Sequence, residues 1–386
     1  MSIKNKLTRN VFYCYLPIIV IFVVIRILSG YGYLSFLGTV GTYLVNAGIQ
    51  IVLLFSIPVF IFPRLQKIKV KDALKFYNFR KISIRAVLIS ILIGIIVYIL
   101  NVFVASFFSS VLTGVGYRSV SGSQTISGYP FWLLLINLLV TAVLPAICEE
   151  TAHRGMLLKG LSPAGRMWAI VLSSVLFGLL HLNIEQVFYT TIIGFLVGYV
   201  ASVTDTIYPA MIIHFMNNAI SVVMGYSSAH NLGYDALFTF ITNNINQNPI
   251  LGILFLIFFI ATLVIVLRYL IKLLFRETAL KNIGTLQKEL LKEITRESYL
   301  KELDDIYNGF EPTEKRNMTV DFETFNKLYQ EKSFDLGQSS SLDKKLMSDF
   351  RPYKMDAVTK ILIAASVLLT FAITFLTFLW GILWYK

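Results

Sequence analysis

The chain has 386 residues, of which 56% are hydrophobic, and its mean hydropathy is +0.70. Soluble domains average about 45–50% apolar residues even with glycine counted, so this composition argues against a soluble globular protein. The net charge of +12 would suit a nucleic-acid-binding protein, but the basic clusters flank long apolar runs, so we expect no nucleic-acid partner. Cys14 and Cys148 form neither a disulfide framework nor a CxxC metal site.

Nine apolar segments are predicted to be membrane spans, because about 20 apolar residues cross about 30 Å of hydrocarbon. In chain order they are 11–29, 38–62, 84–108, 130–150, 167–183, 185–203, 208–225, 249–274 and 357–384. The first follows a basic N-terminus and lacks a small-residue cleavage site, so we interpret it as a retained anchor helix. The sequence therefore predicts an all-α fold, a polytopic transmembrane helical bundle of about nine spans, or eight if the last segment does not cross.

The segment 276–356 differs from the rest of the chain, because it mixes Glu, Lys, Asp and Arg with scattered Leu, Tyr and Phe. Within 277–303 the apolar residues recur at helical spacing, which predicts one amphipathic helix. About 80 residues is small for an independent hydrophobic core. We therefore expect a small cytoplasmic helical appendage that docks on the membrane body or binds a cytoplasmic protein partner.

Basic residues are distributed unevenly among the loops. The N-terminus, the connection at 64–85, the turn near 159–166 and the segment after the eighth span are rich in Lys and Arg. The loops that alternate with them contain Arg118 as their one basic residue. Cytoplasmic loops carry the excess of Lys and Arg, so we predict a cytoplasmic N-terminus and, with nine spans, a C-terminus on the other side.

Ionisable side chains at membrane depth are costly and usually functional. In this sequence they concentrate between the fourth and seventh spans, which also contain three of the four histidines. The residues concerned are Glu149, Glu150, His153, Arg154, His181 and His214. We therefore expect a polar site inside this part of the bundle.

Helical geometry brings several of these residues to a similar depth. A hairpin turn near 162–165 lies about 15 residues from Glu149 and about 16 from His181, hence roughly 22–25 Å from each. Counting inward from the start of the fourth span places Glu149 near the cytoplasmic end of the bilayer core. Glu150 and Arg154 are four residues apart and can pair, whereas Glu149 points about 100° away from Glu150 and is free for substrate or water.

Other residues in the same region have simpler interpretations. His153 belongs to no expected pair and is interpreted as a surface or helix-capping group. Gly194 and Gly198 form a GxxxG pattern, which is typical of close helix packing rather than of a binding site.

Three short motifs occur in order on these apolar helices. They are EExxxR at 149–154, FxxxH at 177–181 and HxxxN at 214–218. The segment from about 130 to 225 resembles the CAAX protease and bacteriocin-processing family (CPBP, also called Abi), which includes the CAAX prenyl endopeptidases. The resemblance implies a membrane-embedded peptidase, and a bacterial plasma membrane is the expected location.

The resemblance also implies a role for each motif residue. The implied catalytic residues are Glu149, His181, His214 and Asn218, supported by Glu150 and Arg154. Glu149 would activate the attacking water with help from His181. His214 and Asn218, which share one helix face, would stabilise the oxyanion of the tetrahedral intermediate.

We favour a site without a metal or other cofactor, because a glutamate and a histidine can activate water by themselves. The alternative is a metalloprotease in which Glu149, His181 and His214 hold Zn²⁺, since two histidines, one glutamate and a water are a known catalytic ligand set.

The expected organisation has five regions. They are N-terminal transmembrane helices (1–129), catalytic helices (130–225), an outer loop with a transmembrane helix (226–275), the cytoplasmic appendage (276–356) and a C-terminal transmembrane helix (357–386). The expected partners are the lipid bilayer and a peptide or membrane-protein substrate, such as a prenylated protein, pheromone precursor, bacteriocin leader or anti-sigma factor. A non-catalytic membrane scaffold or bacteriocin self-immunity factor on the same fold is the alternative. A transporter or channel is disfavoured, because no second polar region marks an inverted repeat.

Overall fold

The computed structural model describes residues 2–119, 130–233, 243, 248–286, 342 and 353–383, and every regular element within these ranges is a helix. The elements are α1 (Ile3–Gly30), η1 (Ser35–Leu37), α2 (Gly38–Ile49), η2 (Gln50–Phe55), η3 (Ile57–Ile61), α3 (Phe62–Gln66), α4 (Val70–Phe76), α5 (Ile84–Gly114), α6 (Phe131–Asn137), η4 (Leu138–Val143), α7 (Leu144–Glu150), η5 (Thr151–Leu158), α8 (Lys159–Leu161), η6 (Ser162–Ala164), α9 (Arg166–Leu180), α10 (Ile184–Thr204), α11 (Tyr208–His230), α13 (Pro249–Leu286) and α18 (Ala357–Leu383). The predicted all-α polytopic bundle is confirmed. Most of the predicted appendage lies outside the described residues, and the division into five regions stays a prediction.

Seven helices in the described ranges are long and apolar enough to cross a membrane. They are Ile3–Gly30, Ser35–Gln66, Ile84–Gly114, Phe131–Ala164, Ile184–Thr204, Pro249–Ala279 and Ala357–Leu383. The predicted spans at 167–183 and 208–225 are also helical, as α9 and α11, but α9 has only 15 residues. α11 has 23 residues and contains the polar side chains of the HxxxN motif. The chain is therefore an integral membrane protein whose two less typical helices carry part of the polar cluster.

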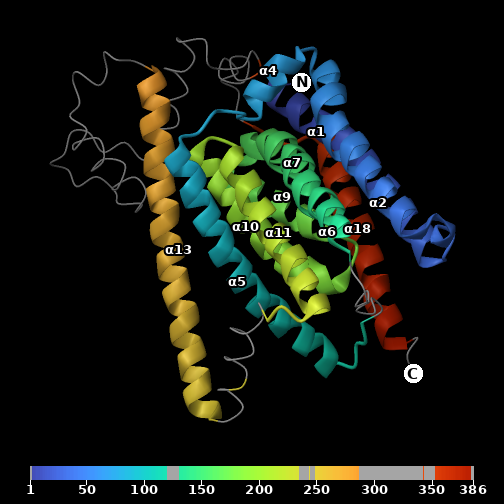
Figure 1. Ribbon diagram of the computed structural model, residues 1–386. Coiled ribbons are helices and arrows are strands. Elements are labelled where there is room, and N and C mark those ends of the chain that lie inside the picture. Colours follow the sequence, from blue (N-terminus) through green and yellow to red (C-terminus); the bar gives the residue numbers. More distant parts are fainter. Residues whose placement is uncertain are drawn as a thin grey trace.

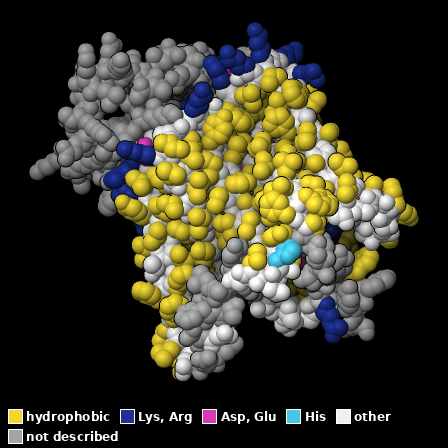
Figure 2. All heavy atoms as spheres, in the orientation of Figure 1, with side chains coloured by type: hydrophobic (Ala, Val, Ile, Leu, Met, Phe, Trp, Pro, Cys, Tyr) yellow, Lys and Arg dark blue, Asp and Glu magenta, His cyan; other side chains and the backbone are white. Residues whose placement is uncertain are grey.

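The helices that carry the motifs lie in the middle of the bundle (Figure 1). α9 packs on α10, and α11 packs on α5 and α7. α13 lies at one edge beside α5, whereas α1, α2 and α18 lie on the other side. An α-helix satisfies its own backbone hydrogen bonds, so apolar side chains can cover the outside of the bundle, and they do so on the face in Figure 2. The peripheral helices thereby separate the central polar residues from lipid.

Two glycines allow α10 to approach α9 closely. A Cβ atom on Gly178 would lie 1.9 Å from Thr191 Oγ1, and one on Gly194 would lie 3.1 Å from a ring carbon of Phe177. A Cβ atom on Gly198 would make only an ordinary contact, at 3.6 Å from Ile170. The predicted close packing is thus confirmed at Gly194, which sits directly against the FxxxH motif.

Basic side chains gather at the end of the bundle that contains the N-terminus and α4 (Figure 2). At this end Asp205, in the turn between α10 and α11, accepts hydrogen bonds from Arg80 (2.6 Å) and from the Asn78 amide. Lys159 of α8 lies 3.9 Å from the same carboxylate. Asp205 therefore ties the α4–α5 connection to the two helices that carry the end of the site.

The described helices alternate in direction, so that α1 begins and α18 ends at opposite ends of the bundle (Figure 1). This arrangement agrees with an odd number of crossings. Which end faces the cytoplasm stays a prediction from the charge asymmetry.

Candidate active site

The fourth span contains two adjacent carboxylates, Glu149 and Glu150, that lie in different surroundings. α7 is a short α-helical segment between two wider helical turns, η4 and η5, and such wide turns are frequent at functional sites. Glu149 is 16% exposed and lines a cavity, whereas Glu150 is fully buried. Consecutive helical residues point about 100° apart, so one carboxylate remains accessible while its neighbour is enclosed, as predicted.

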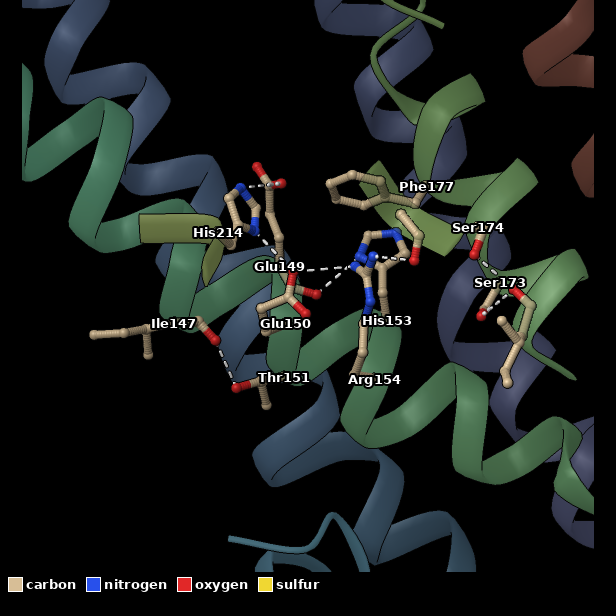
Figure 3. A network of polar contacts seen from close by, with 12 residues as sticks. Ile147, Glu149, Glu150, Thr151, His153, Arg154, Ser173, Ser174, Phe177 and His214 are labelled. Carbon is tan, nitrogen blue, oxygen red and sulfur yellow. Dashed lines mark hydrogen bonds and ion pairs between the residues drawn. The ribbon is translucent and has the colours of Figure 1, made fainter. Parts of the chain in front are cut away.

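Glu150 is the centre of a buried charged network (Figure 3). Its Oε1 accepts hydrogen bonds from Arg154 Nη1 at 3.1 Å and from His214 Nδ1 at 2.7 Å. Arg154 also donates from Nη2 to the Gly194 carbonyl (3.0 Å). The predicted Glu150–Arg154 pair is confirmed, but the Glu150–His214 contact depends on the packing of α11 against α7 and has no signal in the sequence.

His214 lies between the two carboxylates. Its Nδ1 faces Glu150, and its Nε2 is 3.9 Å from Glu149 Oε2. Because Glu150 Oε1 already accepts from Arg154, we assign the proton of this contact to His214 Nδ1. His214 can therefore donate from Nε2 only as the doubly protonated imidazolium, which the buried Glu150 carboxylate is placed to stabilise.

His181 ends α9 and is oriented by its own helix. Its Nδ1 lies 3.0 Å from the Phe177 carbonyl, which can only accept, so Nδ1 carries a hydrogen. The neutral ring then presents the lone pair of Nε2 to the cavity that His181 lines. Leu182 follows with φ of 50°, a left-handed conformation that turns the chain from α9 into α10. The orientation of His181 suits it to accept a hydrogen bond from water.

Phe177 separates the polar groups and fixes their planes. Its ring centroid lies 5.0, 5.2 and 5.8 Å from those of His153, His181 and His214, with each ring pair nearly perpendicular. The guanidinium carbon of Arg154 lies 4.5 Å from the same ring centroid. The phenylalanine of the FxxxH motif thus packs against all three histidines and one cation, and its face is suited to the positive charge.

The interpretation of His153 as a surface or capping group is wrong. His153 is fully buried, because every residue of η5 is enclosed by neighbouring helices. Its Nδ1 donates to the Glu149 carbonyl (2.8 Å), and its Nε2 accepts from the Tyr15 hydroxyl (2.9 Å). Tyr15 comes from α1, outside the motifs, and thereby anchors the backbone of Glu149; the sequence contains no signal for this contact.

The four residues proposed to be catalytic line one cavity of about 830 Å³. Its walls come from α1, α2, η2, α5, η4, α7, α9, α10 and α11. Arg26 and Ser29 line it near the end of α1 that is remote from the basic N-terminal end. The cavity therefore extends from Glu149 through the half of the bundle opposite the basic N-terminal end, and the depth of Glu149 in the membrane stays a prediction.

Asn218 reaches the cavity through a row of amides. Its Nδ2 donates to the Thr141 carbonyl (3.0 Å), and its Oδ1 accepts from Asn217 Nδ2 (3.0 Å). One hydrogen of its amide group is thus committed to Thr141 and the other is available for a ligand. The structure brings Asn218, Glu149, His181 and His214 to one cavity, and their catalytic roles stay predictions.

The zinc alternative fits these coordinates poorly. Among the residues that the structure describes, no three His, Cys, Asp or Glu side chains are grouped as metal ligands. We therefore derive no catalytic step through a metal.

Comparison with known proteins agrees with the motifs. Residues 130–220 match the family described as "Type II CAAX prenyl endopeptidase Rce1-like". No curated protein and no solved structure gives a significant match. The matched segment contains all three motifs and begins just before α6, and the family implies protease activity. The chain is a polytopic membrane protein in which residues 130–220, about a quarter of its length, are similar to the CAAX prenyl endopeptidases.

Proposed function

We propose that the protein is an intramembrane endopeptidase that hydrolyses a peptide bond of a membrane-associated, prenylated or leader peptide. The observation that carries this proposal is the approach of Glu149 and His214, at 3.9 Å, in a cavity that His181 and Asn218 also line. An accessible carboxylate beside hydrogen-bond donors is the arrangement that hydrolysis of an amide requires.

In the proposed reaction Glu149 removes a proton from water, and the resulting hydroxide attacks the scissile carbonyl carbon. The lone pair of His181 Nε2 accepts the second water hydrogen and holds the nucleophile in place. His214, as the imidazolium, donates from Nε2 to the oxyanion, and Asn218 donates its remaining amide hydrogen. When the intermediate collapses, Glu149 returns its proton to the leaving amine, so protons balance over the cycle.

This proposal changes the role of Glu150. The sequence suggested a supporting pair with Arg154, but the 2.7 Å contact makes Glu150 the residue that orients His214. A carboxylate on Nδ1 stabilises the imidazolium that donates from Nε2. Glu150 is therefore a positioning residue that acts through His214.

We also propose that the protein resides in a bacterial plasma membrane with a cytoplasmic N-terminus. The substrate then reaches Glu149 through the cavity from the half of the bundle opposite the basic end. We retain as proposals a cytoplasmic partner for 276–356 and the non-catalytic alternative, a scaffold or self-immunity factor.

The test is a comparison of membrane peptides between cells that contain the wild-type protein and cells that contain Glu149→Ala at equal membrane levels. The endopeptidase proposal predicts that at least one intact peptide accumulates in the variant and that its fragments disappear. Restoring the wild-type gene should reverse both changes. Identical peptide profiles, with a phenotype that depends on 276–356 instead, would favour the scaffold.

A further inference from the structure

Three asparagine side chains form a continuous row along the wall of the cavity. Asn101 Nδ2 of α5 donates to Asn217 Oδ1 of α11 (3.3 Å), and Asn217 Nδ2 donates to Asn218 Oδ1 (3.0 Å). Asn218 Nδ2 donates to the Thr141 carbonyl of η4 (3.0 Å). All three asparagines and Thr141 line the cavity.

The direction of this row is fixed at its far end. Pro145 has no N–H, so it cannot donate to the carbonyl four residues earlier, which is that of Thr141. A backbone carbonyl can only accept, so Asn218 must turn its NH₂ group towards Thr141. Asn217 and Asn101 must then take the same orientation, and the oxygen and nitrogen assignments of all three amides follow from the Thr141 carbonyl.

The row ends in an acceptor with no partner. Asn101 Oδ1 is buried and forms no hydrogen bond with any residue that the structure describes. An unmet acceptor inside a membrane protein is unfavourable, because neither lipid nor an apolar side chain can replace water. Hydrogen bonds in a row also polarise one another, so the first acceptor of this row is stronger than an isolated amide.

We propose that Asn101 Oδ1 binds a backbone N–H of the substrate peptide. A helix must unwind locally before its peptide bond is accessible, and unwinding releases N–H groups that need new acceptors within the membrane. Asn101 lines the cavity, and its unpartnered Oδ1, which is closed to solvent in this structure, becomes such an acceptor when the side chain turns towards a bound peptide. Asn218, at the other end of the row, faces the scissile carbonyl. This inference rests on the proposed endopeptidase function and assigns it an extended, unwound peptide as ligand.

The row also explains how binding and chemistry are connected. A peptide N–H on Asn101 strengthens the donation from Asn101 to Asn217 and from Asn217 to Asn218. The Asn218 amide is then held more firmly where the oxyanion forms. Asn101 and Asn217 thus position Asn218. Asn217 lies in the matched segment 130–220, whereas Asn101 is on α5, outside it.

The experiment uses the full-length protein in detergent micelles and a fluorogenic farnesylated CAAX peptide as the probe. In one arm, each backbone N–H of the peptide is replaced in turn by an ester oxygen, which removes one donor without changing the side chains. We expect one ester to raise KM about five- to tenfold on the wild-type protein, the usual effect of one lost hydrogen bond. The same ester should have no further effect on Asn101→Leu, whose KM is already raised.

The matched control is Ser110→Leu, which also replaces a polar residue of α5 by leucine. Ser110 is exposed, donates to the Ser106 carbonyl of its own helix, and is not among the described residues that line the cavity. This variant should keep the wild-type KM and the full ester effect. The ester arm on the wild-type protein needs no variant, so a misfolded Asn101→Leu protein does not remove the test.

Binding to the Glu149→Gln background separates this inference from the catalytic proposal. If the peptide binds Glu149→Gln about five- to tenfold more tightly than the Glu149→Gln/Asn101→Leu double variant, the inference is supported even if the wild-type protein cleaves nothing. If the wild type and Asn101→Leu cleave the peptide with equal KM, the inference is overturned. It is also overturned if the effects of the ester and of Asn101→Leu on KM are additive. Either result leaves the proposed endopeptidase function intact. If the peptide binds neither background, the inference is also overturned.

Discussion

Glu149 and Glu150 permit one test with an internal control, because the same Glu→Gln change at two adjacent residues should affect the stability of the protein differently. Glu149 is 16% exposed in the cavity, and its ion pair with His214 is long, at 3.9 Å. Glutamine keeps the shape of Glu149 but cannot take a proton from water. The rate of peptide cleavage should therefore fall on the order of 10²–10⁴-fold, or about 3–5 kcal/mol in activation free energy, with little change in thermal stability.

Glu150→Gln should instead destabilise the protein. The change removes the negative charge from a site where Glu150 is fully buried and contacts both Arg154 Nη1 and His214 Nδ1. Breaking a buried pair by removing one partner leaves an uncompensated charge and costs about 3–5 kcal/mol. The free energy of unfolding should fall by about this amount, together with the catalytic rate, because His214 also loses its orienting carboxylate.

The assay is cleavage of the peptide that accumulates in Glu149→Ala cells, combined with thermal unfolding of both variants in the same detergent. If Glu149→Gln retains more than a tenth of the wild-type rate, Glu149 is not the base. If Glu149→Gln unfolds as early as Glu150→Gln, its loss of activity reflects folding and the argument from exposure is refuted.

Three further predictions follow from the site and the topology. Ser228, near the end of α11, and Ser162, in the α8–α9 turn, are both exposed. Ser228→Cys should react with an impermeant thiol reagent added outside intact cells, whereas Ser162→Cys should be protected. The reverse labelling pattern would show that the predicted membrane orientation is inverted. Chelators should leave the cleavage rate near normal, and loss in phenanthroline that added Zn²⁺ restores would establish the metalloprotease alternative. His181→Ala should slow cleavage about as much as Glu149→Gln, and the double variant should be little slower than either, because both residues act on one water; multiplied effects in a cleavage assay would show that they act independently.

The helices were predictable because their determinant is local: runs of apolar residues long enough to cross the hydrocarbon core. The Glu150–Arg154 pair was predictable for the same reason, since a spacing of four residues on a helix fixes proximity. The order and spacing of the motifs are enough to predict that Glu149, His181 and His214 lie in one region.

Contacts between helices could not be predicted in the same way. The bond from Tyr15 to His153 joins residues 138 positions apart, and the bond from Asn101 to Asn217 joins residues 116 apart. Both depend on which faces of α1 and α5 pack inward, and the apolar residues of α5 are spread around the helix, so they do not select a face. His153 was misinterpreted because helical spacing alone does not reveal that η5 is enclosed on every side.

The charges of the site suggest why an accessible glutamate can remain a base inside a membrane protein. Glu149 and Glu150 contribute two negative charges and Arg154 one positive charge, so a proton on His214 makes the group neutral. A neutral set is the least costly to bury, because each unpaired charge is strongly unfavourable away from water. When Glu149 takes a proton from water, its charge passes to the hydroxide and then to the oxyanion, which forms beside the imidazolium of His214. The net charge of the cavity therefore stays constant through the proposed reaction, and the site has no need to exchange ions with solvent during a catalytic cycle.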